Sequence, residues 1–169
     1  ASYTGSPGNA TQGAQRGQSF TATSDGELAA VEFQNYFIEY APNAYLKIRT
    51  WVTDDDYSQA FNGEVLATSG GIVDGPHYNS GDDWHDLTLF EFDQPATLVA
   101  GTKYVIELVD GMPYIKFTDP YPGGRGYETL NASISGDFPF ATYICTEACA
   151  VSASYTGSPG NATQGAQRG

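Results

Sequence analysis

Short β-prone runs separated by turn signals fill most of this chain, and they constrain its fold more than any other feature. Within 44–52, Leu46 and Ile48 alternate with Tyr45 and Lys47, which is the period of a strand that buries one face. Gly, Pro, Asn and Asp gather between the runs, where the chain must turn. No segment has the 3.6-residue apolar period of an amphipathic helix. The sequence therefore predicts an all-β chain.

The runs also predict the kind of all-β fold. We expect strands over 18–23, 28–40, 44–52, 64–67, 84–92, 95–99, 103–109, 113–118, 138–144 and 150–155. A change of apolar phase near Asn35 indicates a bulge or bend. About eight to ten short strands spaced in this way are typical of an antiparallel β-sandwich of jelly-roll type.

A segment of the chain is duplicated. Residues 1–17 recur as residues 153–169 without a substitution, and both copies read ASYTGSPGNATQGAQRG. The offset of 152 residues is about the length of one domain, and identity at a fixed period is typical of a tandem array. We therefore expect one β-sandwich repeat at 1–152, with its core at about 17–150, and the start of the next repeat at 153–169. An engineered duplication, such as a permuted or self-complemented chain, is the alternative.

The duplicated segment suggests two ways for units to join. Its Gly, Ser, Asn and Gln content suits a slack linker. Alternatively, residues 150–156 (AVSASYT) have the small, β-compatible character of a strand donated to the sheet edge of a neighbouring subunit. Tyr155 and its copy Tyr3 would anchor such a strand. The candidate assembly residues are Ser2, Tyr3, Thr4, Ser154, Tyr155 and Thr156.

The chain is strongly acidic, with a net charge of −13. A nucleic-acid partner or an anionic lipid surface needs a cationic face, so neither is expected. No apolar run reaches the roughly 18 residues of a membrane span, so no membrane insertion is expected. The densest acidic run is Asp54, Asp55 and Asp56. Such a loop could hold a structural Ca²⁺, although it lacks the spacing of an EF-hand, and otherwise no cofactor is expected.

Two cysteines and three sequons bear on the compartment. Cys145 and Cys149 favour a disulfide over a metal site, because only His77 and His85 could complete a ligand set. A disulfide predicts an oxidising, extracellular or cell-surface location. The candidate glycosylation sites, relevant only in a glycosylating host, are Asn9, Asn131 and Asn161.

Exposed aromatic residues raise the possibility of sugar binding. Trp51 and Trp84 are the candidate stacking residues, because flat rings stack on sugar rings. Other aromatic side chains expected on outward faces are Tyr36, Tyr40, Tyr45 and Tyr57. Packing between modules is the alternative use, since Tyr and Trp are also enriched in protein interfaces. No GxSxG, HExxH or phosphate-loop motif is present, and we expect no enzyme activity.

The order of motifs resembles a family of bacterial extracellular β-sandwich modules related to galactose-binding-like jelly rolls. The resemblance covers about residues 17–144. It rests on GQSFTA at 17–22, GEL at 26–28, the strands 84–92 and 100–108, YPGG at 121–124 and DFPFATY at 137–143. It implies a jelly-roll fold in a large secreted or surface protein. Some members of that family bind sugars or calcium.

These observations lead to two hypotheses of function. We expect a structural repeat module of an extracellular filament, stalk or adhesin, whose partners are copies of itself joined head to tail through the duplicated segment. The alternative is a carbohydrate-binding module of a secreted protein, whose partners would be surface glycans.

Overall fold

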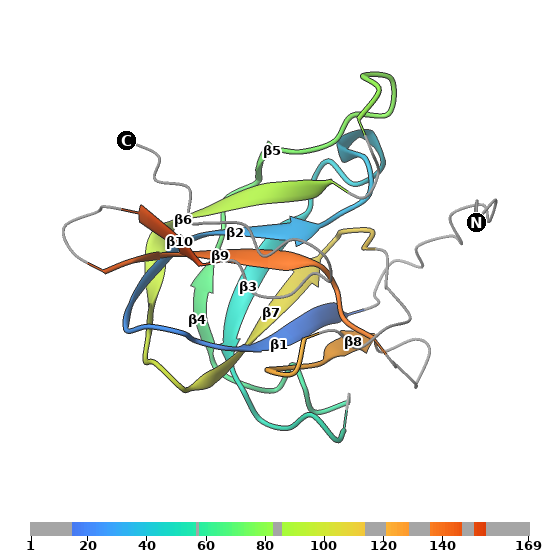
Figure 1. The fold of residues 1–169 in the computed structure, drawn as a ribbon. Helices are drawn as coiled ribbons and strands as arrows, with labels where there is room; N and C mark the ends of the chain where they lie inside the picture. Colours follow the sequence, from blue (N-terminus) through green and yellow to red (C-terminus); the bar gives the residue numbers. More distant parts are fainter. Residues whose placement is uncertain are drawn as a thin grey trace.

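The fold is an antiparallel β-sandwich, as the strand pattern predicts (Figure 1). The computed structural model describes residues 15–56, 58–82, 86–113, 121–128, 136–146 and, for their backbone, 151–154. The described elements are β1 (Arg16–Thr21), β2 (Gly26–Gln34), a 3₁₀ helix (Ile38–Tyr40), β3 (Tyr45–Thr50), β4 (Val65–Thr68), β5 (Ile72–Asp74), β6 (Leu87–Leu98), β7 (Lys103–Val109), β8 (Gly126–Glu128), β9 (Phe140–Cys145) and β10 (Val151–Ser154).

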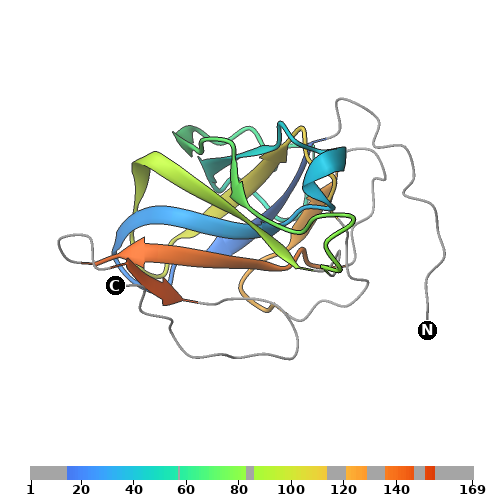
Figure 2. The same cartoon turned by 90° about the horizontal axis from the view of Figure 1, so that it is seen from above.

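The strands form two five-stranded sheets, seen as two layers in Figure 2. One sheet has the order β4-β3-β7-β1-β8 and is called here the β7 sheet. The other has the order β10-β9-β2-β6-β5 and is called the β2 sheet. All the pairings within them are antiparallel.

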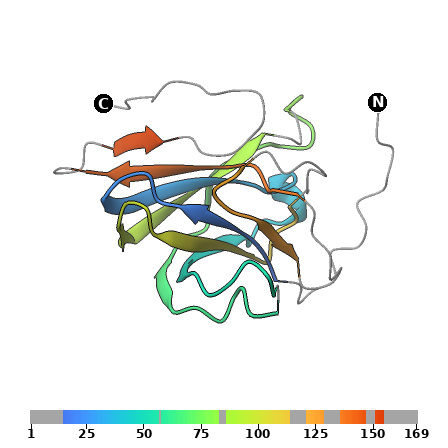
Figure 3. The ribbon, with the colours of Figure 1, turned by 60° about the horizontal axis from the view of Figure 1, so that its bottom comes forward.

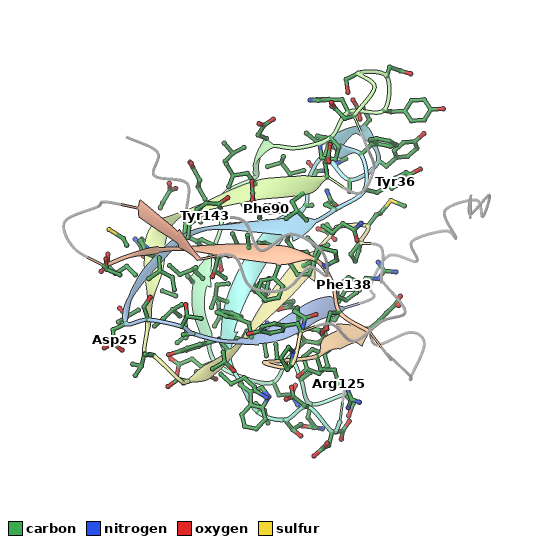
Figure 4. The ribbon with its side chains drawn as sticks, in the orientation of Figure 1. Asp25, Tyr36, Phe90, Arg125, Phe138 and Tyr143 are labelled. Atoms are coloured by element: carbon green, nitrogen blue, oxygen red, sulfur yellow. The ribbon has the colours of Figure 1, made fainter. Side chains whose placement is uncertain are left out.

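The core lies between the two sheets. Aromatic rings connect the layers: the Phe20 ring of β1 lies 6.0 Å from the Phe140 ring of β9. Figure 4 shows Phe138 pointing into the same interior. Burying these side chains supplies the main driving force of the fold. The large side chains that are almost completely buried are Tyr127, Phe20, Phe33, Phe90, Phe138, Phe140, Leu28, Leu46, Ile48, Leu98, Ile106 and Leu108.

Gln18 and Ser19 of β1 connect the β7 sheet to the segment that leads into β9 and to the residues before β8. Gln18 is fully buried; its Nε2 donates to the Asp137 carboxylate at 2.8 Å, and its Oε1 accepts from the Phe138 backbone at 2.9 Å. Ser19 Oγ accepts from the Arg125 backbone at 2.8 Å. Both polar residues therefore have structural partners.

The β3–β4 loop folds over the outer face of the β7 sheet. Ala60 and Phe61 of this loop form a small second core with Val105 and Tyr127. The edge of the Phe61 ring packs against Tyr127, with 6.0 Å between ring centroids. The loop thereby brings its acidic run against β1, β7 and β8.

The observed elements differ from the expected ones at two places. The strand expected at 28–40 ends at Gln34, and the phase change at Asn35 marks this end and the bend at Tyr36 that follows it, not a bulge. The bulge lies instead between Leu28 and Ala30, where the partner strand passes from Ala96 to Glu91. Pro95 sits in this break of the ladder, so β6 runs through it as one strand. The strand expected at 113–118 lies outside the described residues beyond Pro113.

Candidate functional site

The beginning of the second copy of the duplicated segment joins the β2 sheet. β10 is an edge strand that pairs only with β9 among the described strands, with Ala153 opposite Tyr143 and Ser154 opposite Thr142. Figure 3 shows β10 beyond β9 at this edge. The candidate assembly residue Ser154 thus ends the last described strand. The others, Ser2, Tyr3, Thr4, Tyr155 and Thr156, lie outside the described residues.

The end of the first copy joins the other sheet. Arg16 and Gly17 open β1, where Arg16 pairs with Leu108 of β7 and Glu128 of β8. Gly17 pairs with Glu107 of β7 and with Tyr127 of β8. The two ends of the repeated sequence therefore occupy different strands in different sheets.

Side chains hold the end of the first copy in a slot between β7 and β8. Gln15 Nε2 donates to Glu107 Oε1 at 3.1 Å, and Arg16 Nε donates to Glu128 Oε1 at 3.0 Å. A Cβ on Gly17 would overlap the carbonyl oxygen of Ile106 and lie 2.7 Å from the Phe61 ring. Phe61, Ile106, Glu107 and Glu128 are the residues that contact Gln15, Arg16 and Gly17 here, and we call this group of four residues the β7–β8 slot.

Asp54, the first residue of the acidic run, is bound by groups of the protein itself. Its Oδ1 accepts hydrogen bonds from Ser19 Oγ at 2.8 Å, from Trp51 Nε1 at 3.0 Å and from the Tyr127 hydroxyl. Its Oδ2 accepts from Lys103 Nζ at 2.5 Å. The carboxylate therefore anchors the β3–β4 loop to β1, β7 and β8.

These contacts shift two pKa values. Burial alone would raise the pKa of Asp54, but the hydrogen bonds from Lys103, Tyr127, Ser19 and Trp51 outweigh it and lower the pKa to about 2. Burial raises the pKa of the Tyr127 hydroxyl, and its hydrogen bond to the Asp54 carboxylate raises it further. Both groups therefore keep their bonding protonation states across the neutral range.

Asp55 and Asp56 stay at the surface of the loop. Asp56 Oδ1 accepts from the Ser58 backbone at 2.9 Å and from its hydroxyl at 2.6 Å, which forms a local turn. Among the described residues, which include all three aspartates, no group of three or more His, Cys, Asp or Glu is placed to hold a metal ion. The geometry thus gives the calcium hypothesis no support at this loop.

Trp51, one of the two candidate stacking residues, is 41% exposed. Lys103 Nζ lies 5.1 Å from the centroid of its ring, so a cation already occupies the space over the indole. The indole nitrogen is bonded to Asp54. The Trp51 indole therefore already makes contacts within the protein that a stacked sugar ring would have to share. Trp84 and Tyr57 lie outside the described residues.

A more exposed aromatic cluster lies at the end of the β2 sheet. The Tyr36 ring lies 4.7 Å from the Phe37 ring and 5.4 Å from the Tyr40 ring, tilted against both, and the Tyr78 ring meets Tyr40 edge to face at 5.8 Å. Phe37 is the buried base of the cluster, whereas Tyr40 and Tyr78 are 48% and 54% exposed. Figure 4 places Tyr36 at this end of the molecule. We call these four residues the tyrosine cluster.

Sequence reasoning named Tyr36 and Tyr40 as outward aromatic residues but not their partner Tyr78. Tyr78 lies in the β5–β6 loop, far from them in the chain, so no local pattern connects the two loops. The available signal was His77, beside Tyr78 in a segment rich in acidic residues.

An ion pair holds the two loops of the tyrosine cluster together. His77 Nδ1 lies 2.8 Å from Glu39 Oε1, and the Tyr78 backbone donates to Glu39 Oε2 at 3.2 Å. The hydrogen bond to Glu39 raises the pKa of His77 and lowers the pKa of Glu39. The His77 backbone also donates to Asp82 at 3.0 Å.

The remaining predicted sites are only partly described. Cys145 ends β9 opposite Val151 of β10, so a bond to Cys149 would close this hairpin; Cys149 itself lies outside the described residues, and the disulfide stays a prediction. The candidate glycosylation sites Asn9, Asn131 and Asn161 also lie outside them.

No protein-family model matches this chain, and no curated protein matches it. In the part of the chain that the structure describes, no helix has both the length and the apolar character to cross a membrane.

Proposed function

We propose that this chain is a non-enzymatic structural repeat module of an extracellular filament, stalk or adhesin, and that its copies join head to tail through the duplicated segment. One observation carries the proposal. The segment begins in β10, the last described strand of the module, and it ends in β1, the first. A sequence with these two roles is suited to a junction that closes one module and opens the next.

The junction has a simple geometry in this proposal. Ala153 and Ser154 complete one sandwich, and Arg168 and Gly169 stand where Arg16 and Gly17 stand in β1. Residues 155–167 would connect the two, a length that spans at most roughly 45 Å when extended. A contact between unlike faces of identical units adds one unit after another, and it produces an open filament when the rotation between units does not close a ring.

The first test is the mass of the native material after denaturation and reduction. A mass far above 18.1 kDa and near a multiple of one repeat supports a covalent array, in which the two copies are successive junctions. A mass of 18.1 kDa supports free subunits that associate through the segment, or an engineered duplication.

The second test applies to a mass of 18.1 kDa, and it distinguishes free subunits that associate through the segment from an engineered duplication. Sedimentation velocity should compare the full chain with a variant that ends at Ser154, because this variant keeps all of β10. We expect the full chain to form larger assemblies with rising concentration, and the shortened chain to remain a monomer. Equal assembly of the two chains would overturn the proposal.

Carbohydrate binding is the second candidate function, and the tyrosine cluster is the observation that favours it. Two exposed rings, Tyr40 and Tyr78, stand beside the exposed carboxylate of Glu39, which offers both stacking and hydrogen bonding to a sugar. A glycan array tests this function. Binding lost in Tyr40→Ala and kept in Trp51→Ala would place it at the cluster, and the reverse would place it at Trp51. No bound glycan would exclude both sites.

A further inference from the structure

We infer that the β7–β8 slot is the receiving half of the junction, and that it accepts Gln167, Arg168 and Gly169 of a neighbouring copy of the chain. This inference rests on the proposed function and names the contacts that would carry it. Its starting point is that the slot already binds the identical tripeptide, Gln15–Gly17, from the first copy.

The electrostatics of the slot suit this occupant. The Glu128 side chain is 17% exposed and is paired with Arg16. The Glu107 side chain is only 4% exposed; Arg49 neutralises it, and it retains an acceptor oxygen for the amide of Gln15. The β7–β8 slot therefore favours a residue with a neutral hydrogen-bond donor opposite Glu107, followed by a cationic residue opposite Glu128.

Cations are scarce in this chain, which makes the match informative. The protein has seven Lys and Arg against twenty Asp and Glu. Arginine is the one charged residue of the duplicated segment, and it stands at the position that meets Glu128. Arg168 is the equivalent residue of the second copy, and like Arg16 it is the last residue but one of the segment.

The third position is selected by shape. Gly17 lies so close to the carbonyl oxygen of Ile106 and to the Phe61 ring that any side chain would collide with them. Gly169 keeps this requirement in the second copy. The slot thus distinguishes all three residues, by an amide, a charge and the absence of a side chain.

Exchange between chains costs little contact energy. Because the two copies are identical, an incoming segment makes the contacts that the outgoing one loses, as in domain swapping. Two quantities then decide which segment occupies the slot: the effective concentration of the chain's own first copy and the concentration of neighbouring chains. Association by this route should therefore rise steeply with protein concentration.

Two single substitutions in the second copy test the slot without altering the module. Arg168→Glu places a like charge against Glu128, and Gly169→Val adds a side chain where none fits. Gln164→Glu is the matched control, since it adds negative charge to the same segment outside the tripeptide. By sedimentation velocity we expect association at least tenfold weaker for the first two variants and little changed for the control.

The decisive experiment exchanges the charges of the Arg16–Glu128 ion pair and mixes the resulting chain with the Arg168→Glu chain. A partner chain carrying both Arg16→Glu and Glu128→Arg keeps its internal ion pair with the charges reversed, and circular dichroism would confirm that it folds. Alone, this double variant presents the unaltered Arg168 to a slot that has become basic. The Arg168→Glu chain alone presents an acidic segment to the unaltered Glu128, so neither chain should associate with itself. Mixed, the two chains offer matched pairs of opposite charge, and association should return.

The outcomes separate the slot from the proposed function. If Arg168→Glu associates like the unaltered chain while the variant ending at Ser154 does not, the slot inference is wrong and the junction proposal stands. If the variant ending at Ser154 also associates, both are wrong. Failure of the mixed chains to associate, with each one folded, would also overturn the slot.

Discussion

Arg49 and Glu107 form an ion pair across the neighbouring strands β3 and β7, with 2.6 Å between Nε and Oε2 and side chains only 14% and 4% exposed. Glu107 also accepts from Gln15, and Arg49 Nη1 donates to the Gly63 carbonyl at 2.9 Å. The pair joins the β3–β4 loop, the centre of the β7 sheet and the end of the duplicated segment.

We predict that Glu107→Ala lowers the free energy of unfolding by about 3 kcal/mol, because it leaves the Arg49 charge buried without its partner. Glu107→Gln should cost less, since it keeps the shape and one acceptor oxygen. Urea denaturation measures both. The control is Glu91→Ala on the exposed face of β6, which should change stability by no more than about 0.5 kcal/mol. A loss at Glu107 no larger than this control would contradict the prediction.

The Asp54 carboxylate predicts a specific acid sensitivity. Its pKa falls from 3.8 to about 2 on folding, so its contribution is complete above pH 3.8 and is lost as the pH falls toward 2. Because the group is partly exposed, we expect this contribution to be about 1–2 kcal/mol. Asp54→Asn should be less stable than the unaltered chain at pH 6, and the difference should shrink between pH 4 and pH 2. Thermal unfolding across this range measures it, and a constant difference would count against the prediction.

The layers of this fold could be predicted from sequence because each core strand carries its own period-two signal. Phe138, Phe140, Thr142 and Ile144 occupy alternate positions of the sequence, and all four are buried. Leu46 and Ile48 behave in the same way. Burial of one face is a local pattern, and it survives in the amino-acid sequence without knowledge of the partner strands.

The contacts around Asp54 could not be predicted in this way. Three adjacent aspartates read as a solvated or cation-binding loop, yet the first one turns toward Lys103 and Tyr127. Those residues lie far away in the chain, and only the packing of the β3–β4 loop on the β7 sheet brings them together. The short strand β8 was missed for the same reason, because pairing with β1 rather than its own sequence defines it.

Gly17 and Gly71 form a matched pair for testing the slot as part of the folded module. A Cβ at position 17 would collide with the Ile106 carbonyl oxygen, whereas a Cβ at position 71 would meet nothing within 4 Å. We predict that Gly17→Ala lowers the free energy of unfolding by about 2 kcal/mol. Gly71→Ala should be neutral or stabilise by up to about 1 kcal/mol through the unfolded chain. Urea denaturation decides between this and equal effects at the two sites, which would mean that β1 does not hold Gly17 in the slot.

The His77–Glu39 pair predicts a window of pH in which the two loops of the tyrosine cluster are joined. The raised pKa of His77 means that its contribution is present below 6.5 and is lost as the pH rises through the folded pKa. The lowered pKa of Glu39 means that its contribution is present above 4.5 and is lost as the pH falls through its own folded pKa. The loops should therefore be held most firmly at mildly acidic pH.

NMR titration of the imidazole protons measures this coupling directly. Glu39→Gln should lower the pKa of His77, because the hydrogen bond from Glu39 is the largest cause of its shift. Asp74→Asn should lower it by less, since Asp74 acts only through its charge and contributes least among the causes. Equal effects of the two substitutions would show that general negative charge, rather than the direct contact, sets the titration of His77. In that case the ion pair would not be what joins Tyr40 and Tyr78.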